Sequence, residues 1–61
     1  MPYIVQVKYR GAWRQWGYAK FWTRAGAQER MKEAHEYRRR YYGRDLPMRV
    51  RHVPLGYSEA P

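Results

Sequence analysis

Cationic and aromatic side chains are the residues of this sequence that could do chemistry. The chain of 61 residues has 13 Lys and Arg against 5 Asp and Glu, a formal net charge of +8, and 18% of its residues are aromatic. Cations bind phosphate groups and flat rings stack on bases, so this pairing is typical of surfaces that bind nucleic acid. The candidate contacts with nucleic acid or another partner are Lys8, Arg10, Arg14, Trp16, Tyr18, Lys20, Arg49 and Arg51.

A secondary basic patch is formed by four arginines, Arg38, Arg39, Arg40 and Arg44. Three consecutive residues of a helix point in three directions, so they cannot form one site together. One interpretation is solubilising charge, which is favoured near the negative end of a helix dipole. The other is an edge that contacts phosphates and extends the first set of candidates.

The sequence offers little that could support catalysis or metal binding. It has no Cys, which excludes thiolate nucleophiles and thiolate metal ligands. His35-Glu36 matches the start of the His-Glu-x-x-His zinc motif, but Arg39 stands where the second His is required, and His52 lies in a predicted strand. We therefore predict a protein that is not an enzyme, with no catalytic residue, no metal site and no cofactor.

Three segments have the patterns of half-buried strands. Residues 3–10 alternate between two sets of side chains, residues 13–22 are rich in aromatic residues, and residues 48–53 alternate again. Gly11-Ala12 breaks the first pattern and indicates a hairpin turn between the first two strands.

A helix is predicted between the second and third strands, from about Arg24 to Tyr42. Thr23 is a suitable N-cap, and Gly43 can end the helix because glycine tolerates the left-handed conformation. At about 100° per residue, one stripe of the helix faces the sheet. Its members are Ala27, Met31, Ala34, Arg38, Tyr41 and Tyr42.

These elements predict an α+β fold, a single small ββαβ domain in which a three-stranded sheet of order 2-1-3 has one helix packed on one face. We expect the domain to span residues 1–55 and residues 56–61 to form a flexible C-terminal tail. The aromatic content argues against disorder. No apolar run approaches the ~18 residues of a membrane span and no signal peptide is recognisable, so we expect a cytoplasmic protein without a membrane partner.

The turn of the hairpin decides which side chains reach the open face of this sheet. We favour a three-residue turn that pairs Tyr9 with Trp13, which turns Trp13 and Phe21 toward the helix. Trp16, Tyr18 and Lys20 then lie on the open face. A two-residue turn at Gly11-Ala12 would shift the pairing by one residue and exchange the two sets, and a bulge at Gly17 would mix them.

Two family resemblances bear on function. Gly11-x-Trp13, followed by Phe21, Thr23 and Ala27 where a strand meets a helix, resembles the arm-type DNA-binding domain of tyrosine recombinases. In that family a three-stranded sheet enters the major groove. Its three strands precede the helix, whereas this chain has two before the helix and one after it.

The whole chain is also similar to very small, Arg-rich proteins encoded by bacteriophages and prophages. The pattern consists of Tyr3, Val5, Gln6, Gly11, Trp13, Phe21, Thr23 and Ala27. Members that are understood often bind and block a host machine, and they include anti-CRISPR proteins and inhibitors of host polymerase or gyrase. The resemblance implies a phage or mobile-element origin and a binding protein in the host cytoplasm.

Two functions are consistent with these observations. The first is binding of nucleic acid or a nucleoprotein complex through the aromatic and basic face of the sheet. The alternative is a host-protein inhibitor that docks on an acidic protein surface, with a Trp such as Trp16 or Trp22 as its anchor. A homodimer is also possible, because two copies could pool their thin cores.

Overall fold

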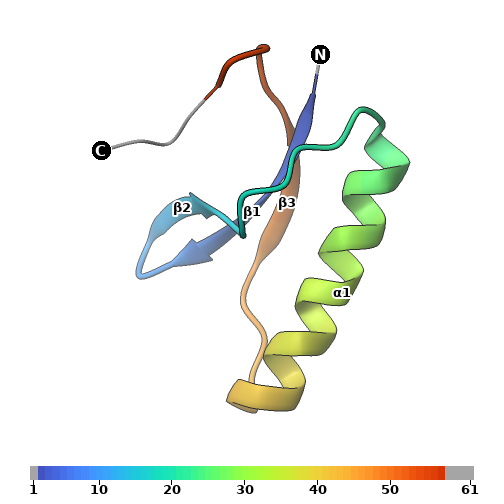
Figure 1. Ribbon diagram of the computed structural model, residues 1–61. Helices are drawn as coiled ribbons and strands as arrows, with labels where there is room; N and C mark the ends of the chain where they lie inside the picture. Colours follow the sequence, from blue (N-terminus) through green and yellow to red (C-terminus); the bar gives the residue numbers. More distant parts are fainter. Residues whose placement is uncertain (1, 58–61) are drawn as a thin grey trace.

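Four elements follow one another in the computed structural model, which describes residues 2–57 (Figure 1). Strands β1 (Tyr3–Tyr9) and β2 (Ala12–Gln15) form a hairpin, helix α1 (Arg24–Tyr42) follows, and strand β3 (Met48–His52) comes last. The sheet order is β2-β1-β3, and β1 is antiparallel to both neighbours. The predicted ββαβ arrangement, its sheet order and the helix on one face are therefore confirmed.

The hairpin turn differs from both turns considered in the sequence. Arg10 and Gly11 form a two-residue turn, and Tyr9 pairs with Ala12 rather than with Trp13. Both turn residues have positive φ, 53° and 81°, as in a type I′ turn, whose twist matches that of the flanking strands. The favoured three-residue turn is wrong, and Trp13 lies beside Lys8 instead of facing the helix.

Strand β2 is shorter than predicted. Its regular pairing ends at Gln15, although Trp16 still donates a backbone hydrogen bond to Val5 (2.8 Å). Residues 17–20 then leave the ladder, with Gly17 at a φ of 75°. The chain returns at Phe21, which forms an isolated bridge with Tyr3. Gly17 thus begins the interruption that its conformational freedom permits.

Helix α1 begins and ends as predicted. The Thr23 side chain accepts a hydrogen bond from the backbone N–H of Gly26 (3.1 Å), and Gly43 follows the last turn in the left-handed conformation, with a φ of 72°. Among the described residues, no helix is long and apolar enough to cross a membrane.

Tyr3 joins the start of α1 to the sheet. Its ring stacks on His52 of the neighbouring strand at 4.6 Å between centroids, and the guanidinium of Arg24 lies 5.4 Å from the centre of the same ring. Since side chains alternate along a strand, Val5 and Val7 share this helix-facing side with Tyr3.

The core is small and mostly aliphatic. Its buried apolar side chains are Ile4, Val5, Val7, Ala27, Ala34 and Val53. The predicted inward stripe of α1 is correct at Ala27 and Ala34 but wrong at its C-terminal end, where Tyr41 and Tyr42 are exposed. Arg38 lies on that stripe, and its guanidinium covers the ring of Tyr42 at 4.5 Å, so the tyrosine packs on a cation rather than on the sheet.

Residues 53–57, which follow β3, are ordered. Leu55 and Gly56 form a turn, and the backbone N–H of Tyr57 donates to the carbonyl of Pro54 (3.0 Å). The first two residues of the predicted tail, Gly56 and Tyr57, are therefore part of the folded structure. The rest of that tail, residues 58–61, lies outside the described residues.

Candidate functional site

The structure has two basic and aromatic surfaces, one on each side of the sheet. The face of the sheet away from α1 carries Lys8 and Trp13, which pair across the hairpin, and Arg49 and Arg51 from β3. We call these four residues, together with Tyr57, the sheet face. Of the eight predicted contacts, only Lys8, Arg49 and Arg51 lie on it.

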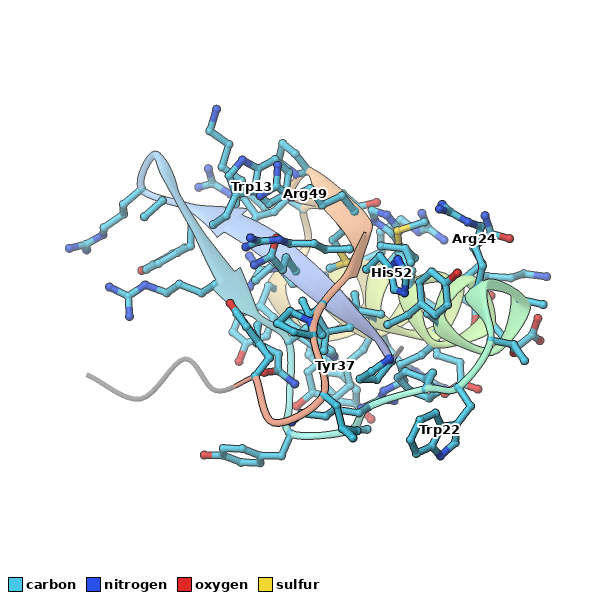
Figure 2. All side chains as sticks on the ribbon, turned by 90° about the horizontal axis from the view of Figure 1, so that it is seen from above. Trp13, Trp22, Arg24, Tyr37, Arg49 and His52 are labelled. Carbon is cyan, nitrogen blue, oxygen red and sulfur yellow. The ribbon has the colours of Figure 1, made fainter. Side chains whose placement is uncertain are left out.

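Arg49 is the most constrained cation of the sheet face. Its guanidinium carbon lies 4.1 Å from the centre of the Trp13 ring, and Figure 2 shows the two side chains side by side. Its Nε donates a hydrogen bond to Oε1 of Gln6 (2.8 Å), and Gln6 is only 2% exposed. A ring and a buried amide therefore hold the guanidinium in one orientation and leave its terminal nitrogens for an anion.

Arg51 has a similar arrangement two residues along β3. Its guanidinium lies 5.6 Å from the centre of the Tyr57 ring. Tyr57 is itself held by Lys20, whose Nζ donates to the Tyr57 carbonyl at 2.6 Å. Lys20, predicted as a contact residue of the open face, thus positions the C-terminal segment instead of lying on the sheet.

The hairpin register moves three predicted contacts off the sheet face. Arg14 is opposite Val7, so its side chain is on the side of α1, and the Trp16 ring meets that of Tyr37 at 5.9 Å, edge to face. Arg10 is in the turn itself. The physical reason is the period of two along a strand, because a shift of one residue exchanges the faces.

Tyr18 is fully exposed in the segment between β2 and the Phe21 bridge. It is accessible, as predicted, but it belongs to neither face of the sheet.

The secondary basic patch divides into three parts. Arg38 and Arg44 line a groove between α1 and the hairpin, together with Arg10 and Arg14. Arg39 instead pairs with Asp45 (3.2 Å), and Arg40 lines a different depression. Of the four arginines predicted to form an added phosphate-binding edge, only Arg38 and Arg44 therefore lie together.

His35, Arg39 and Asp45 tie α1 to the segment before β3. Asp45 Oδ1 accepts hydrogen bonds from Nδ1 of His35 (2.6 Å) and from the backbone N–H of Leu46 (3.1 Å). The hydrogen bond from His35 is the main cause that lowers the pKa of Asp45 below its ordinary value of 3.8, and the charge of Arg39 adds to it. These contacts therefore hold the segment between α1 and β3 against the helix.

Charge on the two surfaces is not neutralised within the described residues. The ion pairs of that part of the chain involve Arg30, His35 and Arg39, and none involves an arginine of the sheet face or the groove. Both surfaces therefore present cations that an external anion can bind.

Sequence reasoning missed Trp13, Gln6 and Tyr57 as parts of the sheet face. A usable signal existed for Trp13: Arg10-Gly11 places glycine at the second position of a two-residue turn, and that turn puts Trp13 opposite Lys8. The role of Tyr57 had no such signal, because it depends on contacts with residues far away in the sequence.

No protein-family model, curated protein or solved structure matches this chain. The resemblances to recombinase arm-binding domains and to small phage proteins stay predictions. The geometry of the two surfaces is the basis for assigning a function.

Proposed function

We propose that this chain is a non-enzymatic module that binds nucleic acid, or a nucleoprotein complex, through its sheet face. The observation that carries the proposal is the pair of arginines on β3, each stacked on an aromatic ring, with Arg49 also held by the buried Gln6. A stacked guanidinium keeps its planar fork pointed outward, which suits the oxygens of a phosphate group.

The spacing of the two arginines supports a chain of phosphates as the ligand. Arg49 and Arg51 are two residues apart on one strand, so they project from the same face, and Lys8 stands on the adjacent strand. Three cations on one face match a repeating anion better than a single one. Contacts with phosphates carry no sequence information, so we expect these three cations to bind the nucleic-acid backbone with little dependence on sequence.

Salt dependence of binding tests the proposal. Three neutralised phosphates on duplex DNA contribute about −2.7 to the slope of log K against log salt, at about −0.9 per phosphate. The double variant Arg49→Gln plus Arg51→Gln should make the slope shallower by about 1.8 and weaken all sequences alike. Lys32→Gln plus Arg40→Gln removes the same charge from exposed positions of α1 and is the matched control.

Two results would contradict the proposal. One is the absence of any mobility shift at ~50 mM salt, where a strongly basic domain should bind nucleic acid at least non-specifically. The other is an equal change of slope in the control variant, which would mean that overall charge and not the sheet face is responsible. The phage or mobile-element origin is a separate prediction from resemblance and does not enter this test.

A second candidate function is docking on an acidic host protein, and one observation favours it. Trp22 is 73% exposed and projects away from the fold (Figure 2). Exposed tryptophans become anchors when a partner buries them. In that case binding would depend only weakly on salt, and Trp22→Ala would remove most of the affinity while Arg49→Gln plus Arg51→Gln would change mainly the association rate.

A further inference from the structure

A groove separates the hairpin from the C-terminal half of α1, on the opposite side of the sheet from Arg49 and Arg51. It has a volume of about 830 Å³, within the range of about 300–1,000 Å³ that small-ligand sites occupy. Four arginines line it: Arg10 from the turn, Arg14 from β2, Arg38 from α1 and Arg44 from the segment after α1. None of the described residues that line it is acidic.

The groove combines this charge with apolar and aromatic surface. Val7 is buried, and the other apolar and aromatic residues of the lining are Tyr9, Trp16, Tyr42 and Leu46. Trp16 is half-buried, and its ring makes a T-shaped contact with the ring of Tyr37 (5.9 Å between centroids), which limits its motion. A partly exposed ring that is restrained by a neighbour can stack on a flat ligand group.

Arg38 differs from the other groove arginines in having a buried Nε without a hydrogen-bond partner among the described residues. Its guanidinium stacks on Tyr42 at 4.5 Å, and within residues 2–57 it has no ion pair with a carboxylate. Buried donors are normally paired, so this guanidinium has unused hydrogen-bonding capacity. Because the Nε itself is covered, an anionic ligand in the groove would meet the terminal nitrogens of Arg38.

We infer that this groove is a second binding site, which takes an unpaired nucleotide of a single-stranded nucleic acid. The base would stack on Trp16 above the apolar lining, and its phosphates would contact the arginines on the two walls. A duplex fits this lining poorly, because its bases are stacked inside and only an unpaired base can reach an aromatic ring. Four arginines exceed the charge of one phosphate group, which favours a strand over a free nucleotide.

This inference takes its class of ligand, nucleic acid, from the proposed function. The side chains that would bind the ligand in the groove are different from those of the sheet face. The sheet face binds the backbone of any nucleic acid, whereas the groove would prefer unpaired bases. One chain would then hold a single strand in the groove and a second phosphate backbone on the opposite face.

Trp16 can report directly on the groove. In the full chain carrying Trp13→Phe and Trp22→Phe, Trp16 is the single indole. We expect a single-stranded oligonucleotide to quench its fluorescence at ~50 mM salt, and the same sequence as a duplex, or a nucleoside monophosphate, to do so only at much higher concentration. In the native chain, Trp16→Ala should weaken binding of the single strand by about 5- to 150-fold, as loss of one stacked base does.

A charge variant tests the groove without touching its packed ring. Arg14→Gln plus Arg44→Gln changes two exposed residues and should make the salt slope for the single strand shallower by about 1.4, at about 0.7 per phosphate. Lys32→Gln plus Arg40→Gln, which removes the same charge elsewhere on the surface, should leave this slope nearly unchanged.

The outcomes separate the groove from the sheet face. Quenching that persists in Arg49→Gln plus Arg51→Gln but is lost in Arg14→Gln plus Arg44→Gln supports the groove site. Loss of all single-strand binding in the sheet-face variant, with no effect of the groove variant, overturns this inference and leaves the proposed function intact. Equal quenching by the duplex or by an acidic peptide also overturns it.

Discussion

Arg49 gains its orientation from two neighbours of different kinds. The Trp13 ring limits the guanidinium plane, and the Gln6 amide oxygen accepts from its Nε. A side chain that is ordered before binding loses less conformational entropy when the ligand arrives. The buried Gln6 is thus a positioning residue for the sheet face as well as a polar group within the core.

Gln6→Met removes this orientation while keeping a side chain of similar size. We expect the affinity for nucleic acid to fall by about 0.5–1.5 kcal/mol, the cost of ordering one long side chain on binding. Equilibrium binding measures the effect, and thermal unfolding verifies that the variant is folded. Gln28→Met, at an exposed position of α1, is the control. Unchanged affinity of a folded Gln6→Met protein would refute the positioning role.

Asp45 makes stability depend on pH in a known direction. Its pKa is lowered in the folded state, chiefly by the hydrogen bond from His35, so folding favours the carboxylate. The stabilisation is present above the ordinary value of 3.8 and is lost as the pH falls through the lower folded-state pKa. Asp45→Asn should melt at a lower temperature than the native chain above pH 3.8, and the difference should shrink at more acidic pH. A difference in melting temperature between the two proteins that stays the same as the pH falls would contradict this role of Asp45.

The hairpin turn is the element that divides the basic residues between two surfaces. Arg10 occupies a φ of 53°, a conformation that costs a residue with a side chain about 1–2 kcal/mol. Asn tolerates this conformation and is preferred in type I′ turns. The turn is therefore strained at Arg10, and its sequence is not optimised for stability.

Arg10→Asn should relieve part of that strain and raise stability by about 0.5–1 kcal/mol. Chemical denaturation measures the change. Arg44→Asn also removes one exposed arginine, but from a position without a positive φ, so it controls for the loss of charge. A decrease in stability, or an equal increase in the control, would contradict the assignment of strain to the turn.

Helix α1 changes character along its length. As far as Ala34 it is close to the sheet, through Ala27 and Ala34, which are buried. In its second half Arg38 occupies the stripe that faces the sheet, and a cation there must keep contact with water or an anion. The groove exists because this half of the helix does not close on the hairpin.

The whole molecule depends on very few buried side chains. A chain of this length typically has about 3–9 kcal/mol of stability. Ile4 is fully buried, and Ile4→Ala should cost about 2–5 kcal/mol. We therefore expect Ile4→Ala to melt at a much lower temperature than the native chain, as measured by circular dichroism, whereas Ile4→Val should lose about 0.5–1.5 kcal/mol and melt close to the native chain. A cooperative transition of Ile4→Ala near that of the native chain would contradict this picture.

Both β2 and β3 are edge strands of the described sheet, with one side open to further pairing. Edge strands invite pairing with another chain, and a small core gains from sharing, so we predict a homodimer at high concentration. The charge of +8 on each copy opposes it, which means that the dimer should strengthen with added salt. Sedimentation equilibrium at several salt concentrations tests this, and a single species of one chain throughout would rule the dimer out.

The sequence by itself determined the elements and their order. Strand alternation, the Thr23 cap and the Gly43 stop are local signals, because each depends on residues a few positions apart. The helix bounds and the ββαβ topology were therefore predictable, as was the presence of a basic and aromatic surface. The limits of β2 were not, since residues 17–20 leave the ladder and Phe21 rejoins it at Tyr3.

Only the tertiary structure decided which cations share a face. One residue of register separates a surface that carries Trp13 from one that carries Trp16. Gly11 suits the observed turn but Arg10 does not, so the local signal for this turn is mixed and does not choose it alone. The approach of Arg38 and Arg44 to Arg10 and Arg14 joins positions about 30 residues apart, across the packing of α1 on the sheet. Such contacts depend on how the elements pack, and no short pattern in the sequence encodes them.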